Sequence, residues 1–348
     1  MDSEVSRRAF LKYSVATSML IAAGDEMIES VMAQSSKGLT EVDKLTVWVL
    51  ADNYYDWNVR DKKITQRYRP KVAGETMHAE HGLSFYIETI VSGKSSVCMF
   101  DYGLNPVGLL NNIALLGLDI GKASAFGLSH GHGDHMLAAV SILRQNQSKM
   151  AAGTPIYVGE EAFNRRYSMR PGRTELDDLG QLSRQDIEAL GLKVVEVKTP
   201  MQIIPGAYIS GNIERVTAYE KVAPTYFIKR GEKPEPDELR TEQSLFFYVK
   251  GKGLVLVSSC AHGGIVNTLK HAQKTSGADR LHAVVGGFHL INAKPEVIQN
   301  TVADIKAMKP EYIVPTHCTG FEAEAAFSRE MPNEFILNTT GTKYTFGV

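Results

Sequence analysis

Residues 123–135 read ASAFGLSHGHGDH, an apolar, strand-like run followed at once by three histidines and an aspartate. Because alternate side chains of an extended segment point the same way, His130 and His132 can reach one metal ion. Asp134 and His135 stand at the turn into a helix-like stretch, residues 136–144, and can face a second ion. Imidazole and carboxylate donors together suit zinc, iron or manganese. The alternative is a polar surface turn, but four potential ligands in six residues favour a metal site.

Three later phrases complete a pattern with this motif: Ser259-Cys260-Ala261-His262-Gly263-Gly264-Ile265, Gly286-Gly287-Phe288-His289-Leu290 and Pro315-Thr316-His317-Cys318-Thr319-Gly320. Together with H-x-H-x-D-H they resemble the metallo-β-lactamase superfamily. The branch they resemble comprises the metal-dependent hydrolases similar to dihydropterin ribofuranosylaminobenzene phosphate synthase. The resemblance spans residues 45–345 and implies an α/β (α+β) fold, a four-layer αββα sandwich with the metal site at one edge of the sheets. It does not identify a substrate, because one fold hosts many chemistries.

The resemblance also implies how the metal ligands are shared between two divalent ions. His130, His132 and one further group would hold the first ion, and Asp134, His135 and His317 the second. His317 directly follows an apolar strand end, which is a rigid support for a ligand. Zinc is the preferred ion, with iron and manganese as alternatives.

Two departures from the family pattern affect the remaining ligands. Cys260 stands where many relatives have a bridging aspartate, and a thiolate can coordinate zinc. The alternatives for Cys260 are a buried free thiol and a disulfide with Cys318. No histidine lies between His135 and His262, so His262 is expected to complete the first site, with His289 as the next candidate. Whichever of these two histidines does not bind metal is placed to donate a proton or to hold substrate.

The other candidate residues carry weaker signals. Asp101 ends an apolar strand, so it could hydrogen-bond a metal-bound histidine and fix its tautomer, or simply form a turn. Four further histidines lack a metal-ligand neighbour or a strand-end position, and we expect them to be surface or core residues: His78, His81, His271 and His282.

Composition restricts the function classes. The chain has 348 residues, 43% of them hydrophobic, and a formal net charge of −1. It can therefore form an extensive core, and it provides no general field to attract nucleic acid. We expect a small-molecule substrate and no nucleic-acid partner. The absence of a G-x-S-x-G pattern and of a P-loop argues against serine hydrolysis and nucleotide-driven chemistry.

The N-terminus needs a separate interpretation. Ser6-Arg7-Arg8-Ala9-Phe10-Leu11-Lys12 resembles the twin-arginine export signal and precedes an apolar run, residues 13–23. Small residues at 31–33 offer a cleavage site. This predicts a signal peptide at residues 1–33, a linker at 34–44 and a catalytic domain at 45–348. The protein would then interact with the twin-arginine export machinery and be located in the periplasm. After cleavage it would not be stably inserted in the membrane. The alternative is an amphipathic N-terminal helix.

Hydrophobic periodicity predicts two halves, each with strands followed by helices, which favours helices outside two packed sheets. The expected strands are residues 45–50, 83–89, 96–100, 123–128, 244–250, 253–258, 281–285 and 311–314, and the expected helices are 107–116, 136–144, 296–307 and one from residue 265. A long aromatic loop, residues 51–82, could line a pocket or anchor itself in the core. The polar stretch 165–243 is expected to cover the site in part. Its arginines could clamp a phosphate, although a solvated face is the preferred interpretation.

The sequence therefore predicts an exported hydrolase in which a metal-bound hydroxide, oriented by Asp134, attacks a small phosphoester, ester or lactone. Two alternatives stay open: an iron-dependent oxidoreductase of the same fold, and a non-catalytic metal-binding sensor.

Overall fold

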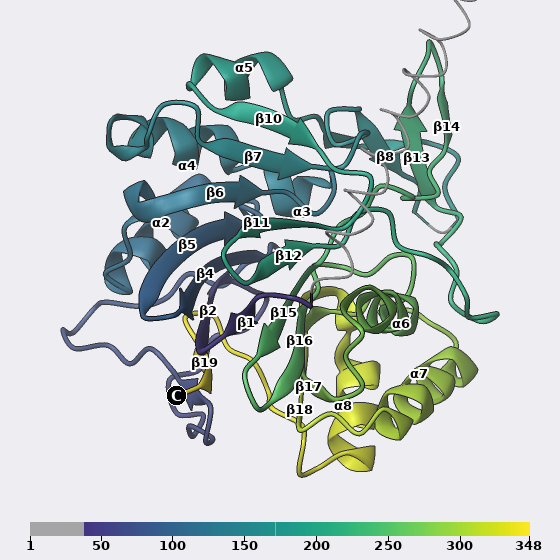
Figure 1. The fold of residues 1–348 in the computed structure, drawn as a ribbon. Coiled ribbons are helices and arrows are strands. Elements are labelled where there is room, and N and C mark those ends of the chain that lie inside the picture. The colour runs from purple at the N-terminus through teal and green to yellow at the C-terminus, as the bar shows by residue number, and fades with distance from the viewer. Residues whose placement is uncertain (1–37, 171) are drawn as a thin grey trace, which may run out of the picture. The chain divides into compact units, whose positions relative to one another are not determined.

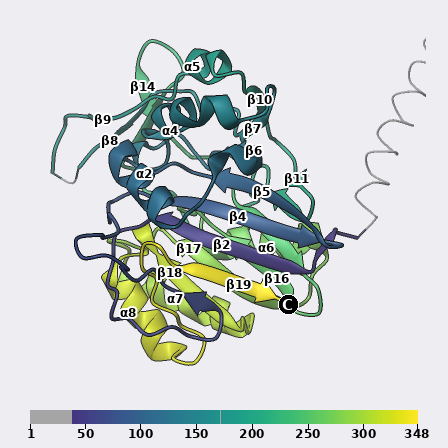
Figure 2. The same cartoon turned by 90° about the vertical axis from the view of Figure 1, so that its left-hand side faces the viewer.

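The computed structural model describes residues 38–170 and 172–348, so the expected signal peptide lies outside the described residues. Residues 40–348 form one compact unit. Two large β-sheets pack against each other, and helices cover their outer faces (Figures 1 and 2). The predicted αββα sandwich is confirmed.

The first sheet is built mainly from the N-terminal half of the chain. In spatial order its described strands are β10 (Lys193–Glu196), β7 (Pro155–Val158), β6 (Ala123–Gly127), β5 (Lys94–Phe100), β4 (Ser84–Val91), β2 (Lys44–Ala51), β19 (Lys343–Gly347) and β3 (Thr65–Gln66). Strands β4 and β5 form a hairpin in which Ser92 and Gly93 both have positive φ, as a two-residue hairpin turn requires. From β5 to β10 the strands run parallel. The last strand of the chain, β19, pairs with β2 and β3.

The second sheet comes mainly from the C-terminal half. Its described strands are β11 (Met201–Ile204), β12 (Ala207–Ile209), β15 (Leu245–Val249), β16 (Gly253–Val257), β17 (Leu281–Gly287) and β18 (Tyr312–Thr316), with β1 (Glu41–Val42) beside β15. Strands β16, β17 and β18 are parallel. Their carboxyl ends therefore lie at one edge of this sheet.

The core follows from the two-residue period of the strands. In β2, Val47 and Val49 are fully buried between the sheets, whereas Trp48 and Leu50 pack on the outer face. That outer face is covered by α2 (Pro106–Leu115), α4 (Ala139–Asn146) and α5 (Arg184–Ala189). The second sheet is covered by α6 (Ile265–Ser276), α7 (Pro295–Ala307) and α8 (Phe321–Glu330).

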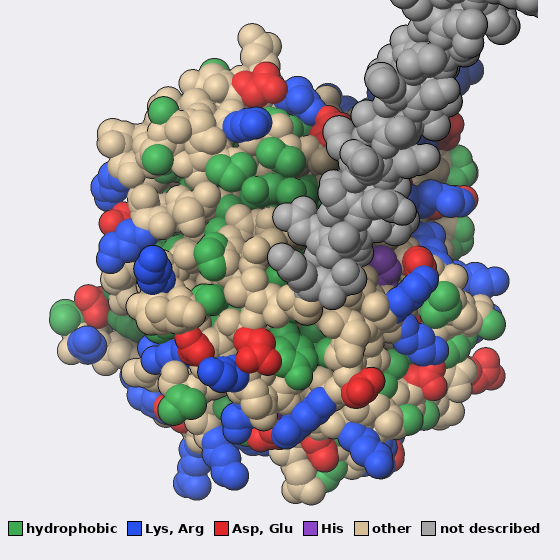
Figure 3. All heavy atoms as spheres, in the orientation of Figure 1, with side chains coloured by type: hydrophobic (Ala, Val, Ile, Leu, Met, Phe, Trp, Pro, Cys, Tyr) green, Lys and Arg blue, Asp and Glu red, His purple; other side chains and the backbone are tan. Residues whose placement is uncertain are grey.

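A small third sheet is formed by the polar middle segment. Its strands, in the order β14 (Pro234–Pro236), β13 (Tyr226–Lys229), β8 (Arg166–Ser168) and β9 (Asp177–Gly180), are antiparallel. One face of the described chain carries interspersed acidic and basic side chains (Figure 3). Within residues 38–170 and 172–348, no helix is both long and apolar enough to cross a membrane.

All of the predicted strands are present, and so are the predicted helices, except that residues 137–138 interrupt the one expected at 136–144. Helices α5 and α8 and several strands were not predicted. Strands β7, β10, β11, β12 and β19 complete the two large sheets, and β1 lies in the stretch expected to be a linker. The first four are four residues long or shorter. Such short strands carry too few alternations to be distinguished from loops.

Candidate metal centre

The candidate ligands stand where parallel strands end. His130 follows β6, Cys260 follows β16, and His317 follows β18 in a short 3₁₀ helix, η3 (His317–Thr319). Asp134 and His135 lie on the single-turn helix α3 (Gly133–Met136). Side chains far apart in the sequence are therefore held at one edge by the two packed sheets.

Three histidines form the first group. Nε2 of His130 lies 3.1 Å from Nδ1 of His132 and 3.2 Å from Nε2 of His262. Burial lowers the pKa of all three imidazoles well below the ordinary value. They are therefore neutral, as a metal ligand must be. The converging atoms, Nε2 of His130, Nδ1 of His132 and Nε2 of His262, are three imidazole nitrogens held close together, and such a set fits a cation.

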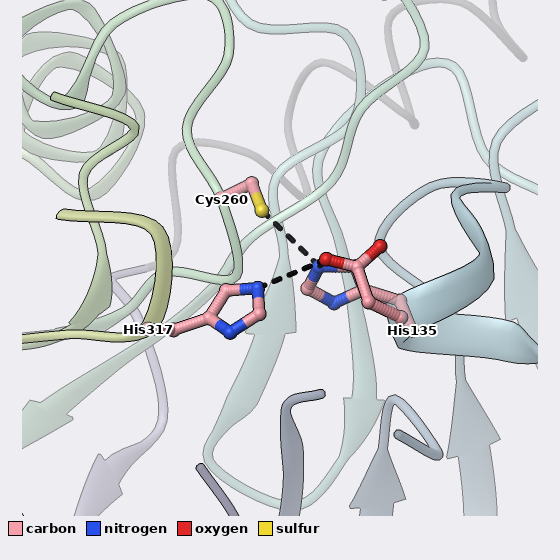
Figure 4. Close-up of side chains that lie close together, drawn as sticks. His135, Cys260 and His317 are labelled. Atoms are coloured by element: carbon pink, nitrogen blue, oxygen red, sulfur yellow. Dashed lines mark hydrogen bonds and ion pairs between the residues drawn. The ribbon is translucent and has the colours of Figure 1, made fainter. Parts of the chain in front are cut away.

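The second group joins Asp134, His135, Cys260 and His317, whose ligand atoms all lie within 4.8 Å of one another. Nε2 of His317 is 3.2 Å from Oδ2 of Asp134, and Sγ of Cys260 is 3.1 Å from Nε2 of His135. Figure 4 shows these side chains converging from separate elements. Burial lowers the pKa of His135, but the carboxylates of Asp134 and Asp101 outweigh burial, and the net shift is upward.

Cys260 belongs to both groups, since its sulfur also lies within 4.8 Å of ligand atoms of His130 and His262. Cys260 thus lies between the two groups, and its role as a bridging ligand stays a prediction. The Sγ atoms of Cys260 and Cys318 are 3.3 Å apart, and both cysteines are free, so the structure has a thiol pair and not the alternative disulfide. Burial and the adjacent Cys318 raise the pKa of the Cys260 thiol.

Asp101 supports the centre from behind, as one of its two interpretations predicted. Its buried carboxylate accepts hydrogen bonds from Nδ1 of His135 at 2.9 Å and from Oγ of Ser129 at 2.8 Å. Oγ of Ser259 also donates to it. This arrangement fixes the orientation of the His135 ring and directs Nε2 into the centre.

Two buried carboxylates that sequence reasoning missed support the other loops. Asp52 accepts the backbone N–H of His317 at 3.1 Å and the Asn338 amide at 2.6 Å. Glu242 accepts the backbone N–H groups of His262 at 3.0 Å and Gly263 at 3.2 Å. Burial raises the pKa of Glu242 to about 7. No local pattern identifies either residue, because each acts on a loop far away in the sequence.

The backbone around the centre is strained at four non-glycine residues, which have positive φ: Asp101 (61°), Ala261 (56°), His289 (46°) and His317 (54°). Each follows a strand that ends at the centre. Such conformations cost about 1–3 kcal/mol and persist only where the surroundings enforce them. Their clustering marks this edge as the functional region of the described chain.

A pocket of about 360 Å³ opens onto the centre. It is lined by His81, Leu104, His132, Gly133, Asp134, Leu137, Ser168, Asp178, Leu179, Tyr226, Cys260, His262, His289, Ile291 and Cys318. The hydroxyl of Tyr226 lies 3.2 Å from Nε2 of His289. His289 thus faces the pocket and also forms, with Cys260 and Cys318, a third group whose ligand atoms lie within 4.8 Å of one another, whereas His262 joins His130 and His132.

His81 is an exposed histidine, as expected, but it lies beside the centre. Its ring stacks on that of His317 with centroids 4.9 Å apart, and its Nε2 lies 3.6 Å from Oδ2 of Asp134. It was missed because it stands alone in a long loop. The other three histidines of that set make contacts away from the centre: His78 with Glu80, His271 with Ser210, and His282 with Glu311.

The polar middle segment covers the site in part, as predicted, because Ser168, Leu179 and Tyr226 of the small sheet line the pocket. Three of its arginines are paired with aspartates. Arg165 pairs with Asp178, Arg170 pairs with Asp177, and the buried Arg166 pairs with Asp237. The exposed pairs of Arg165 and Arg170 support the solvated-face interpretation over a phosphate clamp, whereas Arg166 is a buried structural residue. From the aromatic loop, His81 lines the metal pocket, whereas Trp57 lines a separate one.

Comparison with known proteins identifies the family. No family model matches the chain. The chain is 31% identical over 300 residues to 7,8-dihydropterin-6-methyl-4-(β-D-ribofuranosyl)-aminobenzene-5'-phosphate synthase of Methanocaldococcus jannaschii, covering 85% of this chain and 94% of the relative. The chain belongs to the family of this synthase. An uncharacterised protein of the same organism, MJ0448, is 28% identical over 265 residues, 76% of this chain and 92% of that protein.

A solved structure confirms the fold of this synthase-family member. The crystal structure of Tm1679, described as a metal-dependent hydrolase of the β-lactamase superfamily, matches with a TM-score of 0.66 at 24% identity. The match covers 87% of this chain and 99% of Tm1679. The metallo-β-lactamase fold, and His, Cys and Asp groups that could bind metal at its sheet edge, therefore describe this chain.

Proposed function

We propose that the chain is a metal-dependent hydrolase of small-molecule substrates that holds two divalent ions, preferably zinc. The observation that carries the proposal is the position of Cys260, whose sulfur is shared by the three-histidine group and the Asp134 group. Asp134, His135 and His317 by themselves match the two-histidine, one-carboxylate set typical of non-haem iron, but the added soft thiolate of Cys260 favours zinc. His130, His132 and His262 would hold one ion, Asp134, His135 and His317 the other, and Cys260 would bridge them.

Divalent ions bound here would lower the pKa of a water molecule and polarise a substrate oxygen. The chain's own residues supply orientation and protons. Asp134 is the partly exposed carboxylate at the pocket floor, where it can orient a water molecule. His289 and Tyr226 face the same pocket and are hydrogen-bonded to each other, so this pair can hold a proton for a leaving group. The expected substrates are phosphoesters, esters or lactones.

Element analysis of the purified protein, together with hydrolysis assays, tests this proposal. We expect two equivalents of zinc per chain and turnover of at least one substrate among bis(nitrophenyl) phosphate, nitrophenyl phosphate, nitrophenyl acetate and a γ-lactone. His132→Ala should lose about one equivalent and nearly all turnover. His282→Ala is the matched control, since His282 is buried and paired with Glu311 away from the centre. Equal metal content and activity in His132→Ala and wild type would overturn the assignment.

We further propose export by the twin-arginine route to the periplasm, on the strength of Arg7 and Arg8 and the apolar run that follows them. Arg7→Lys together with Arg8→Lys keeps the charge and changes the guanidinium pair. Fractionation and immunoblotting should then find uncleaved precursor in the cytoplasm. Normal maturation of the double variant would refute export by this route and leave the hydrolase proposal intact.

A further inference from the structure

The pocket over the metal centre has an apolar rim. Four aliphatic side chains line it, from four separate segments: Leu104 after β5, Leu137 after α3, Leu179 in β9 and Ile291 after β17. Leu104, Leu137 and Ile291 are 40%, 47% and 46% exposed. Single exposed aliphatic residues are common on protein surfaces, but several around one concave opening are typical of a binding site.

The same lining lacks a basic anchor for an anionic group. Apart from histidines, the charged residues that line the pocket are Asp134 and Asp178, and no lysine or arginine is among the lining residues. Arg165 stands close to the rim, but its guanidinium is paired with Asp178. Recognition of a phosphate away from the metal ions would need unpaired Arg or Lys donors. The rim therefore favours an uncharged, apolar part of the substrate.

We infer that the rim residues Leu104, Leu137, Leu179 and Ile291 bind an alkyl or acyl chain attached to the scissile ester or lactone bond. This inference rests on the proposed function and narrows it. It also separates this chain from its relative, whose name specifies a phosphate-bearing product. The polar floor positions the reactive group, and the rim selects the chain attached to it.

The measurable consequence is a dependence on chain length. Complete burial of one methylene group favours binding by up to about fourfold, and burial at a half-open rim by less. With the zinc-loaded protein, kcat/KM for nitrophenyl alkanoates should rise about two- to fourfold per methylene from acetate to hexanoate. The kcat/KM for nitrophenyl phosphate should stay below that for the longer esters. Ile291→Asn and Leu137→Asn should flatten this slope. Val216→Asn is the control, because Val216 is 60% exposed but lies outside the pocket.

Binding of alkyl hydroxamates of the same chain lengths, measured by calorimetry on the zinc-loaded protein, tests the rim without turnover. The hydroxamate group provides a common metal-binding head, so the change in Kd with length reports on the rim. If Kd falls steeply with chain length in wild type and less steeply in Ile291→Asn, the inference is supported, even where no ester is hydrolysed. The lack of ester hydrolysis would then refute the hydrolase proposal and leave this inference intact. If no hydroxamate binds, the inference is overturned. It is also overturned if Kd does not change with chain length while compact esters are hydrolysed efficiently, and that result leaves the hydrolase proposal standing.

Discussion

The sulfur of Cys260 lies 3.1 Å from Nε2 of His135, so a thiol and an imidazole face each other between the two ligand groups. Cys260 follows β16 and His135 lies on α3, so each large sheet contributes one of the two residues. A ligand at this point ties the two halves of the centre together. Substitutions of Cys260 should therefore change the metal content of the protein in a specific way.

Cys260→Asp should retain two metal ions, because the carboxylate restores an oxygen bridge, whereas Cys260→Ala should lose one ion. Element analysis after dialysis checks both variants. In wild type the bound metal should also protect Cys260 from alkylation, and chelation should expose it. Cys98 serves as an internal control, because it is fully buried within the sheets and away from the centre. Full metal loading of Cys260→Ala would leave the thiol without a role as ligand.

His317→Ala should remove chiefly the ion proposed to be held with Asp134 and His135, because the imidazole is the candidate ligand that follows β18. Element analysis should find one equivalent of metal. In a cobalt-substituted sample, the absorption spectrum should keep the bands of the ion bound by the three histidines. His271→Ala is a suitable control, since that histidine bonds to the Ser210 carbonyl. An unchanged two-metal stoichiometry would show that His317 has been misassigned.

Asp101→Asn should weaken metal binding about 10- to 100-fold without changing the ligand count, because the amide no longer fixes the His135 ring as a carboxylate does. Competition with a chromogenic chelator measures this affinity. Asp119→Asn provides the comparison, since Asp119 caps a 3₁₀ helix outside the centre. Equal metal affinity in Asp101→Asn and wild type would show that the hydrogen bond to His135 does not contribute.

Arg166→Met should destabilise the fold by about 3–5 kcal/mol, because it leaves the carboxylate of Asp237 buried without its partner. Both side chains are almost completely buried, with Nε of Arg166 2.8 Å from Oδ2 of Asp237. The double variant Arg166→Met with Asp237→Leu should recover much of the loss in urea unfolding. The exposed pair of Arg165 and Asp178 offers a control, and Arg165→Met should change stability by less than about 1 kcal/mol. A single variant as stable as wild type would contradict this prediction.

Glu324 gives a pH-dependent prediction. Burial, and secondarily Asp52, raise its pKa from 4.5 to about 7. Between pH 4.5 and about 7, Glu324 binds a proton more often in the folded state than in the unfolded state. Its contribution to stability is therefore largest below pH 4.5 and is lost as the pH rises to about 7. Glu324→Gln should remove that part of the slope. Urea unfolding of the metal-free protein at several pH values measures it, and identical slopes for the variant and wild type would refute it.

The sequence predicts the fold and most of the candidate centre because the candidate ligands sit in compact motifs at the ends of apolar strands. His130, His132, Asp134 and His135 fall within six residues, and a strand end aims Cys260 and His317 from a rigid support. The periodicity of the longer strands likewise identifies both large sheets.

The remaining contributions to the site could not be predicted because they depend on tertiary contacts. His81 stacks on His317 across 236 residues of sequence. Tyr226 reaches the pocket from a small sheet made of short, polar strands. Asp52 holds the backbone of His317 from the opposite end of the chain. Such contacts leave no spacing or composition that a local pattern would reveal.

Strand β19, the last element of the chain, lies between β2 and β3, two of the earliest. The first sheet therefore cannot be completed until residues 343–347 have been synthesised, and until then a nascent chain would expose the edge of β2. Pairings between distant parts of a sequence also slow folding. Closure of this sheet is thus a late event in synthesis, because β2 must wait for a partner strand that is made near residue 343.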